Sequence, residues 1–216
     1  MPSQLILPLQ TESAMTRADF ITAPGNARAL AFLEAWPNWP NPAAALFGPP
    51  ASGKTHLARI WAAQAGAIVI EAGALCTPPD GAVVVENCDQ PEVQAHQAAL
   101  FALMERGAPL LLTGRSPPPL WPVSLPDLAS RFRAMIALEL REPDEALLTA
   151  LAVKLFADRQ LKVPPAVVTS LVRHLERTPA AIRAFIAKAD AEAMRLQKPV
   201  NLQLVRGLMS DDGNLS

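Results

Sequence analysis

Five short apolar runs divide the first two thirds of the chain, and each has the length of a β-strand. Helical spacing of apolar residues appears between them and before the first. Continuous apolar strands that alternate with helices indicate an α/β fold with a parallel sheet covered on both faces. The predicted strands are Ala43–Phe47, Ala67–Glu71, Ala82–Glu86, Pro109–Thr113 and Met135–Leu140, and the predicted helices are Asn26–Ala35, Lys54–Ala65 and Gln90–Arg106.

Beyond residue 142 the strand-like runs stop and helical periodicity takes over. Prolines stand near the predicted helix starts, where a missing N–H group does little harm. We therefore expect a flexible tail at 1–18, a nucleotide-binding α/β subdomain at 19–142 and a small all-helical lid subdomain at 143–216. The predicted lid helices are Asp144–Arg159, Pro165–Glu176, Pro179–Gln197 and Leu202–Met209.

Composition narrows the class of protein. Of 216 residues, 50% are hydrophobic and 18% are charged, so the chain can bury a core. The net charge of −1 gives no basic surplus, which argues against direct sequence-specific DNA binding. Two cysteines and three scattered histidines provide no zinc or disulfide framework, and neither a signal peptide nor a membrane span is visible. We expect a cytoplasmic protein.

The segment after the first predicted strand matches the phosphate-binding loop GxxxxGK[ST] and opens a predicted helix. Its backbone N–H groups and the helix dipole would bind phosphates. Lys54 would neutralise β/γ-phosphate charge, and Thr55 would supply an oxygen to Mg²⁺. The alternative is a chance match in a tight turn, which the flanking strand and helix disfavour. The predicted nucleotide-binding residues here are Gly48, Pro49, Pro50, Ala51, Ser52, Gly53, Lys54, Thr55 and His56.

The third predicted strand ends in a carboxylate, Glu86, followed by Asn87. In P-loop ATPases an acid at the first position acts on Mg²⁺, so Glu86 is a second candidate metal ligand. The next position often activates the attacking water, but an asparagine amide takes up no proton. Asp89 is a candidate substitute that we expect to lie off the sheet edge. The sequence predicts nucleotide binding with slow intrinsic hydrolysis.

These segments, in this order, resemble the initiator clade of the AAA+ ATPases, to which the bacterial replication initiator DnaA belongs. The resemblance covers about residues 18–209 and implies a five-stranded parallel sheet followed by a helical lid. The matching segments are the extended P-loop at 53–57, the Walker B strand at 83–87, the sensor 1 strand and loop at 110–118, and the box VII segment at 125–132.

The chain ends after the helical region, so we expect no helix-turn-helix DNA-binding domain. In this it resembles Hda-like regulators, which are DnaA homologues. The tail is similar to the QLxLPL motif by which those regulators bind the DNA polymerase sliding clamp. The alternative is an ordinary frayed tail. The residues of the motif-like segment are Gln4, Leu5, Leu7, Pro8 and Leu9.

The resemblance implies a partner, DnaA, whose bound ATP is hydrolysed faster in the presence of the regulator. Arg131 is similar to the arginine finger of the family, a guanidinium that stabilises transferring phosphate in trans. The alternative is an ion pair with Asp127, four residues earlier on a helix. Arg133 is a second candidate finger.

Two positions depart from the family pattern. Arg115 stands where relatives carry an aspartate, and Ala180 stands at the sensor 2 position, with Arg177 and Arg183 one turn to either side. We assign Arg183 to the nucleotide site together with Thr113 of the sensor 1 strand, with both arginines being solvated helix residues as the alternative. The bound nucleotide would be ADP or ATP, and a homo-oligomer is left open.

Two rival functions follow from the same residues. The first is an autonomous ATPase of the initiator clade, such as a helicase loader or a DNA-remodelling protein, which Asn87 and the near-zero net charge disfavour. The second is a small-molecule P-loop kinase, which fits poorly with the box VII-like segment and the helical C-terminal region.

Overall fold

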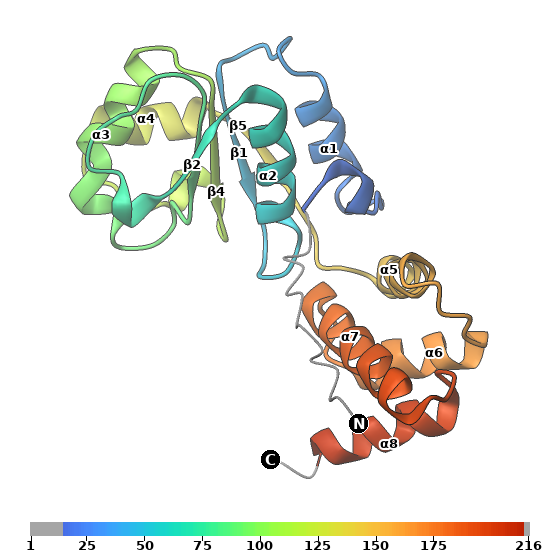
Figure 1. The fold of residues 1–216 in the computed structure, drawn as a ribbon. Coiled ribbons are helices and arrows are strands. Elements are labelled where there is room, and N and C mark those ends of the chain that lie inside the picture. Colours follow the sequence, from blue (N-terminus) through green and yellow to red (C-terminus); the bar gives the residue numbers. More distant parts are fainter. Residues whose placement is uncertain (1–14, 214–216) are drawn as a thin grey trace, which may run out of the picture.

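The centre of the molecule is a five-stranded parallel sheet with the strand order β2-β3-β4-β1-β5 (Figure 1). The structure, a computed structural model, describes residues 15–213. The α/β fold and the sheet predicted from the sequence are confirmed, and each strand boundary agrees within one residue. The strands are β1 (Ala43–Phe47), β2 (Ile68–Glu71), β3 (Val83–Glu86), β4 (Leu110–Gly114) and β5 (Ile136–Glu139).

Helices cover both faces of this sheet. α1 (Ala27–Glu34) and α2 (Lys54–Ala65) pack on one face, and α3 (Val93–Glu105) and α4 (Pro126–Ala134) lie on the other (Figure 1). Neighbouring residues of β4 point to opposite faces, so Leu111 joins the core under α1 and α2 while Leu112 joins the core under α3. This double burial explains why the strands read as continuous apolar runs.

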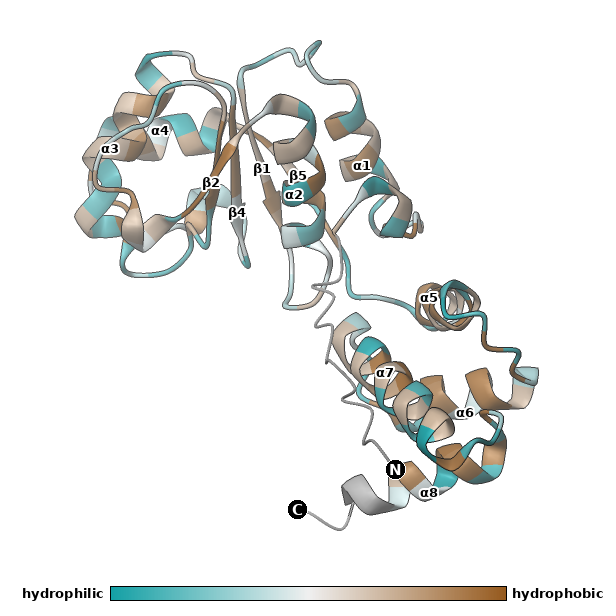
Figure 2. Ribbon diagram, viewed as in Figure 1, coloured by the Kyte–Doolittle hydropathy of each residue, from teal (hydrophilic) through white to brown (hydrophobic). Residues whose placement is uncertain are grey.

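Hydropathy follows the same layering. Figure 2 shows the central strands coloured toward the hydrophobic end of the scale, whereas the helices carry both colours. A helix buries one stripe and exposes another, which gives this mixed pattern. Between residues 15 and 213, none of the helices combines the length and the apolar character that crossing a bilayer requires.

One helix was missing from the elements predicted by periodicity. α4 begins at Pro126, whose ring suits the first helical position, and buries only Leu128 and Phe132, which are four residues apart. Phe132 meets the ring of Trp121 edge-to-face, with a centroid distance of 5.0 Å. The prolines before α4 resemble those of a loop, and two buried positions are too few to reveal a period.

The C-terminal part of the chain is helical and has its own apolar core. The helices are α5 (Glu145–Asp158), α6 (Pro165–His174), α7 (Pro179–Leu196) and α8 (Leu202–Gly213). Three of them start with side-chain caps. Asp144 accepts a hydrogen bond from the Leu147 N–H group (2.7 Å), Thr178 accepts one from the Ala181 N–H group (3.1 Å), and Asn201 accepts one from the Leu204 N–H group (2.9 Å). Figure 1 shows this group beyond the P-loop end of the sheet.

Replacing Leu111 with alanine should reduce the free energy of unfolding by about 2–5 kcal/mol, because it leaves a cavity in the centre of the sheet. The matched control is Leu120→Ala, since the Leu120 side chain is 71% exposed and should change stability by less than about 0.5 kcal/mol. Urea denaturation followed by circular dichroism measures both. Equal stabilities of the two variants would contradict this assignment of the core.

Candidate functional site

The P-loop follows β1 and is fixed in place by its first glycine. A Cβ atom on Gly48 would lie 2.1 Å from the carbonyl oxygen of Leu140, so only glycine fits between β1 and the chain leaving β5. The Gly48 N–H group donates to the carbonyl of Gly114 at the end of β4 (3.3 Å). The loop is thereby tied to both strands that flank β1.

Lys54 lies across the mouth of this loop. Its Nζ donates to the carbonyl oxygens of Gly48 and Pro49, both at 2.7 Å, and lies 3.4 Å from Ser52 Oγ. Burial lowers the pKa of Lys54; the charge of Arg115 lowers it further and that of Asp89 opposes the shift. α2 starts directly after Gly53, which has no side chain to cap the helix. The free N–H groups of this helix end, next to a fixed ammonium group, can hold a phosphate chain.

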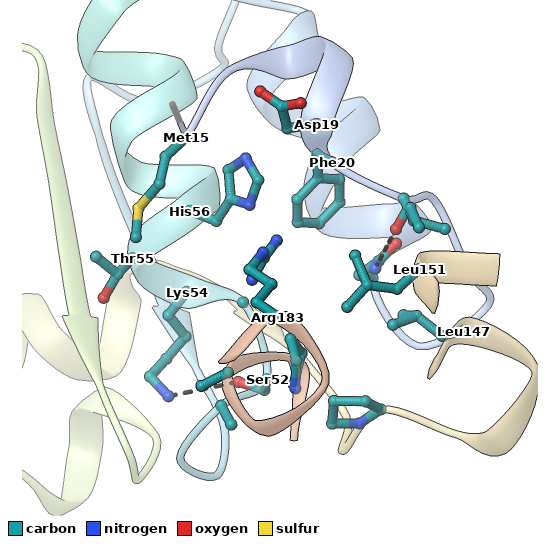
Figure 3. Close-up of a pocket in the computed structure, with 17 residues that line it drawn as sticks. Met15, Asp19, Phe20, Ser52, Lys54, Thr55, His56, Leu147, Leu151 and Arg183 are labelled. Carbon is teal, nitrogen blue, oxygen red and sulfur yellow. Dashed lines mark hydrogen bonds between the residues drawn. The ribbon is translucent and has the colours of Figure 1, made fainter. Parts of the chain in front are cut away.

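A cavity of ≈ 220 Å³ adjoins the P-loop (Figure 3). Its walls come from three separate segments: the chain around the short 3₁₀ helix Arg17–Asp19, the P-loop with the start of α2, and the lid. Phe20 meets His56 edge-to-face at 5.1 Å, and the His56 Nε2 atom lies 2.9 Å from the carbonyl oxygen of Thr16. Apolar walls beside a phosphate-binding loop suit a planar base.

The lid contributes one cation to this cavity. Figure 3 shows Arg183 extending from α7 toward His56 and Phe20. Burial lowers the pKa of the Arg183 guanidinium, and the charge of Asp19 opposes this shift. Its Nε atom is buried without a hydrogen-bond partner in the described part of the chain. Arg177 is exposed. Reading Arg183 as a solvated helix residue is therefore wrong. Arg177 is solvated as that reading expected, but it lies in the connection between α6 and α7 and not on a helix.

The residues proposed for Mg²⁺ fit that ion. Glu86 ends β3, is only 6% exposed, and has a buried Oε1 atom without a partner among residues 15–213. A buried carboxylate oxygen is costly unless a cation or donor satisfies it. Thr55, on the first turn of α2, is exposed and keeps its hydroxyl available. These two side chains would hold the ion, which would neutralise phosphate charge.

Asn87 is committed to a neighbouring strand. Its backbone is left-handed, with φ of 61°, and its Nδ2 donates to Glu71 Oε2 at the end of β2 (2.8 Å). Its backbone N–H group donates to Thr113 Oγ1 (3.3 Å); Thr113 is 2% exposed and does not line the cavity beside the P-loop. No sequence motif marks Glu71, because its pairing with Asn87 depends on strand order and register.

Arg131 lies outside this cavity. Its guanidinium forms an ion pair with Glu105 at the end of α3 and stacks over Phe101 at 5.1 Å from the ring centroid. Among the described residues its acidic partner is thus Glu105, and the alternative pairing with Asp127 is wrong. The side chain is 40% exposed. Arg133, two residues further on, is exposed.

Arg131 also lies at the amino ends of the strands, whereas the P-loop lies at their carboxyl ends. It lines a small depression with Ala43, the first residue of β1, and Met135, which directly precedes β5. The P-loop instead follows the last residue of β1. The clamp-motif residues Gln4, Leu5, Leu7, Pro8 and Leu9 lie outside the described residues.

Comparison with solved structures gives the fold its class. Domain III of the Thermotoga maritima replication initiation protein DnaA superposes with a TM-score of 0.75 at 19% identity, over 91% of this chain and 96% of that chain. The chain has a DnaA-like AAA+ fold. No protein-family model matches the sequence, and no curated protein matches it either.

Two further neighbours carry the same AAA+ architecture. A replication initiator DnaA bound to AMPPCP and single-stranded DNA matches with a TM-score of 0.69 at 18% identity, over 86% of this chain and 68% of that one. The Thermotoga maritima RuvB Holliday junction branch migration motor matches with a TM-score of 0.71 at 20% identity, over 91% of this chain and 71% of that one. At these identities the likeness concerns the fold.

Replacing Lys54 with methionine should weaken ATP binding at least about tenfold, because the charge-assisted bonds to phosphate are lost. A fluorescent ATP analogue titrated into each protein measures the dissociation constant. Lys162→Met is the matched control, since Lys162 is exposed between α5 and α6, away from the cavity. Affinity of the Lys54 variant within twofold of the control would refute the proposed role of Lys54.

Proposed function

We propose that this chain is an Hda-like negative regulator of chromosome replication initiation. It binds ADP or ATP with Mg²⁺, attaches to the β sliding clamp, and stimulates hydrolysis of the ATP bound to the initiator DnaA. The proposal combines the motif resemblance with the DnaA-like fold and rests on one observation above all. That observation is the position of Arg131 relative to the chain's own nucleotide cavity.

The position of Arg131 supports a role on a neighbouring molecule. A guanidinium that served the chain's own triphosphate would have to face the P-loop, which follows the carboxyl end of β1. Arg131 instead lies beside Ala43 at the amino end of that strand, with 40% of its side chain exposed. In an assembly, a guanidinium there can enter a partner's site and stabilise charge on the transferring phosphoryl group.

The chain's own site supports the regulatory half of the proposal. The lysine, the free helix N-terminus and Arg183 can bind a nucleotide, and a DnaA neighbour has AMPPCP bound. Asn87 cannot take a proton and donates its amide to Glu71. Nucleotide then acts mainly as a structural ligand that fixes the lid against the α/β part.

The tail supplies the tether. In the segment 4–9, Leu7 and Leu9 would fill an apolar pocket on the clamp while the Gln4 amide forms hydrogen bonds at its rim. Tethering raises the effective concentration of the regulator near clamp-loaded DNA without any new contact to the initiator.

The alternative is an autonomous initiator-clade ATPase, such as a helicase loader or a DNA-remodelling ATPase. The nearly complete phosphate site and the RuvB-like fold favour it. The Asn87 side chain and the absence of a basic surplus disfavour it. The two functions differ in where ATP is consumed, which the next experiment separates.

Arg131→Ala should reduce stimulation of DnaA-bound ATP hydrolysis by at least about 100-fold, because an arginine finger contributes 10³–10⁵ in rate. The assay follows labelled ATP on DnaA in the presence of clamp-loaded DNA. Arg133→Ala, on the same exposed helix end, should retain stimulation. Stimulation by the Arg131 variant equal to wild type would disprove the trans mechanism, and loss in the Arg133 variant alone would move the finger to that residue.

Gln4→Ala and Leu7→Ala should each raise the dissociation constant for the sliding clamp at least about tenfold, since a few anchor residues carry most of the binding energy of an interface. Immobilised clamp and surface plasmon resonance provide the measurement. Gln10→Ala is the control, because Gln10 belongs to the same tail but lies outside the motif-like segment. Unchanged binding of all three variants would remove the clamp from the proposal.

A further inference from the structure

The turn that follows β3 is held against the phosphate site. Cys88 donates its backbone N–H to the carbonyl of Thr113 (2.8 Å), and Gln90 closes the turn by donating to the carbonyl of Asn87 (3.1 Å). The residue after Thr113 is Gly114, whose carbonyl accepts the bond from the first P-loop glycine. The turn and the P-loop are thus attached to consecutive residues of β4. From its position in the sequence we expected Asp89 to lie off the sheet edge. The structure instead holds the turn that contains Asp89 against the end of β4.

Within this turn, Asp89 has one oxygen engaged and one free. Its Oδ2 accepts a hydrogen bond from the Gln90 side-chain amide (3.2 Å). Its Oδ1 is buried and has no hydrogen-bond partner within residues 15–213. The negative charge of Asp89 also reaches Lys54, where it favours the charged ammonium. A free, buried carboxylate oxygen close to the phosphate-binding lysine requires either a donor or a function.

Three strands end in other carboxylates on this side of the sheet, and the one on β5, Glu139, is exposed. Glu71 Oε2 accepts the Asn87 amide at the exposed end of β2, the outermost strand of the sheet. Glu86 is the residue proposed to hold Mg²⁺. Asn87, in the position next to Glu86, donates its amide to Glu71 and cannot accept a proton from water. Among residues 15–213, Glu86 and Asp89 are the acids with a buried oxygen that has no hydrogen-bond partner, and Glu86 is already assigned to Mg²⁺.

We propose that Asp89 is the general base for this chain's own slow ATP hydrolysis, displaced two residues from the position that Asn87 occupies. Asp89 Oδ1 accepts a proton from the attacking water as the water oxygen bonds to the γ-phosphorus. The bond from that phosphorus to the β–γ bridging oxygen breaks, leaving ADP and inorganic phosphate. This inference rests on the nucleotide binding of the proposed function but not on the clamp or DnaA.

Two measurements test this role. Single-turnover hydrolysis with protein in excess over ATP should slow about 100-fold in Asp89→Asn, the lower end for loss of a general base. Glu71→Gln should stay within about twofold of wild type, because its carboxylate is exposed and bound to Asn87. The second measurement is binding of fluorescent ATP and ADP analogues. A carboxylate facing the γ-phosphate repels it, so Asp89→Asn should raise the ATP-to-ADP affinity ratio about tenfold.

Each outcome decides between the proposals. Failure of the wild-type protein to bind either ATP or ADP overturns the nucleotide role and the proposed function with it, whereas binding of ADP alone overturns only the role of Asp89. Binding without measurable hydrolysis, or an Asp89→Asn rate equal to wild type, overturns the role of Asp89 alone. A larger loss in Glu71→Gln than in Asp89→Asn transfers the base to β2. A slowed Asp89→Asn with an unchanged affinity ratio places Asp89 away from the γ-phosphate and refutes it as the base.

Discussion

The close approach of Gly48 to the carbonyl oxygen of Leu140 governs the rest of the arrangement. Without room for a Cβ atom, the phosphate loop has one position between the ends of β4 and β5. Residue 140 also begins the connection to α5, so the same contact sets where the lid departs from the sheet. The loop, the ends of β4 and β5 and the start of the lid connection are therefore attached to one another at this point.

The cavity beside the P-loop depends on segments that are far apart in the chain. Lys154 of α5 donates to Asp19 at 3.1 Å, and its pKa is raised by hydrogen bonds to Asp158 and Asp19. Asp19 in turn attracts the guanidinium of Arg183 from α7. The N-terminal segment is thus an electrostatic bridge between the P-loop side and the lid. These three parts all line the cavity, so a nucleotide bound there would contact each of them and favour one position of the lid.

Much of the fold could be predicted because its signals are local. The apolar strands, the P-loop glycines and the proline-marked lid helices each occupy a short window of sequence. α4 was not predicted, because a nine-residue helix with two buried side chains shows no clear periodicity of apolar residues. The Asn87–Glu71 contact, the inward position of Asp89 and the entry of Arg183 into the cavity depend on strand register and on how the lid packs. The sequence pattern places Ala180 at the sensor 2 position, and it does not indicate which of the neighbouring arginines, Arg177 or Arg183, enters the cavity.

The ion pair of Arg131 with Glu105 and its stacking on Phe101 have a consequence for recognition. An exposed ion pair contributes about 0–1 kcal/mol and an exposed cation–π contact about 0.5–1 kcal/mol. The interaction of the guanidinium with a polyphosphate free in solution is little stronger than its contacts with Glu105 and Phe101. A preorganised, water-excluding pocket on another subunit offers several times more. The contacts of Arg131 with Glu105 and Phe101 can thus make the guanidinium selective for a pocket formed in an assembly over free polyphosphate. This selectivity does not require a separate segment that covers Arg131.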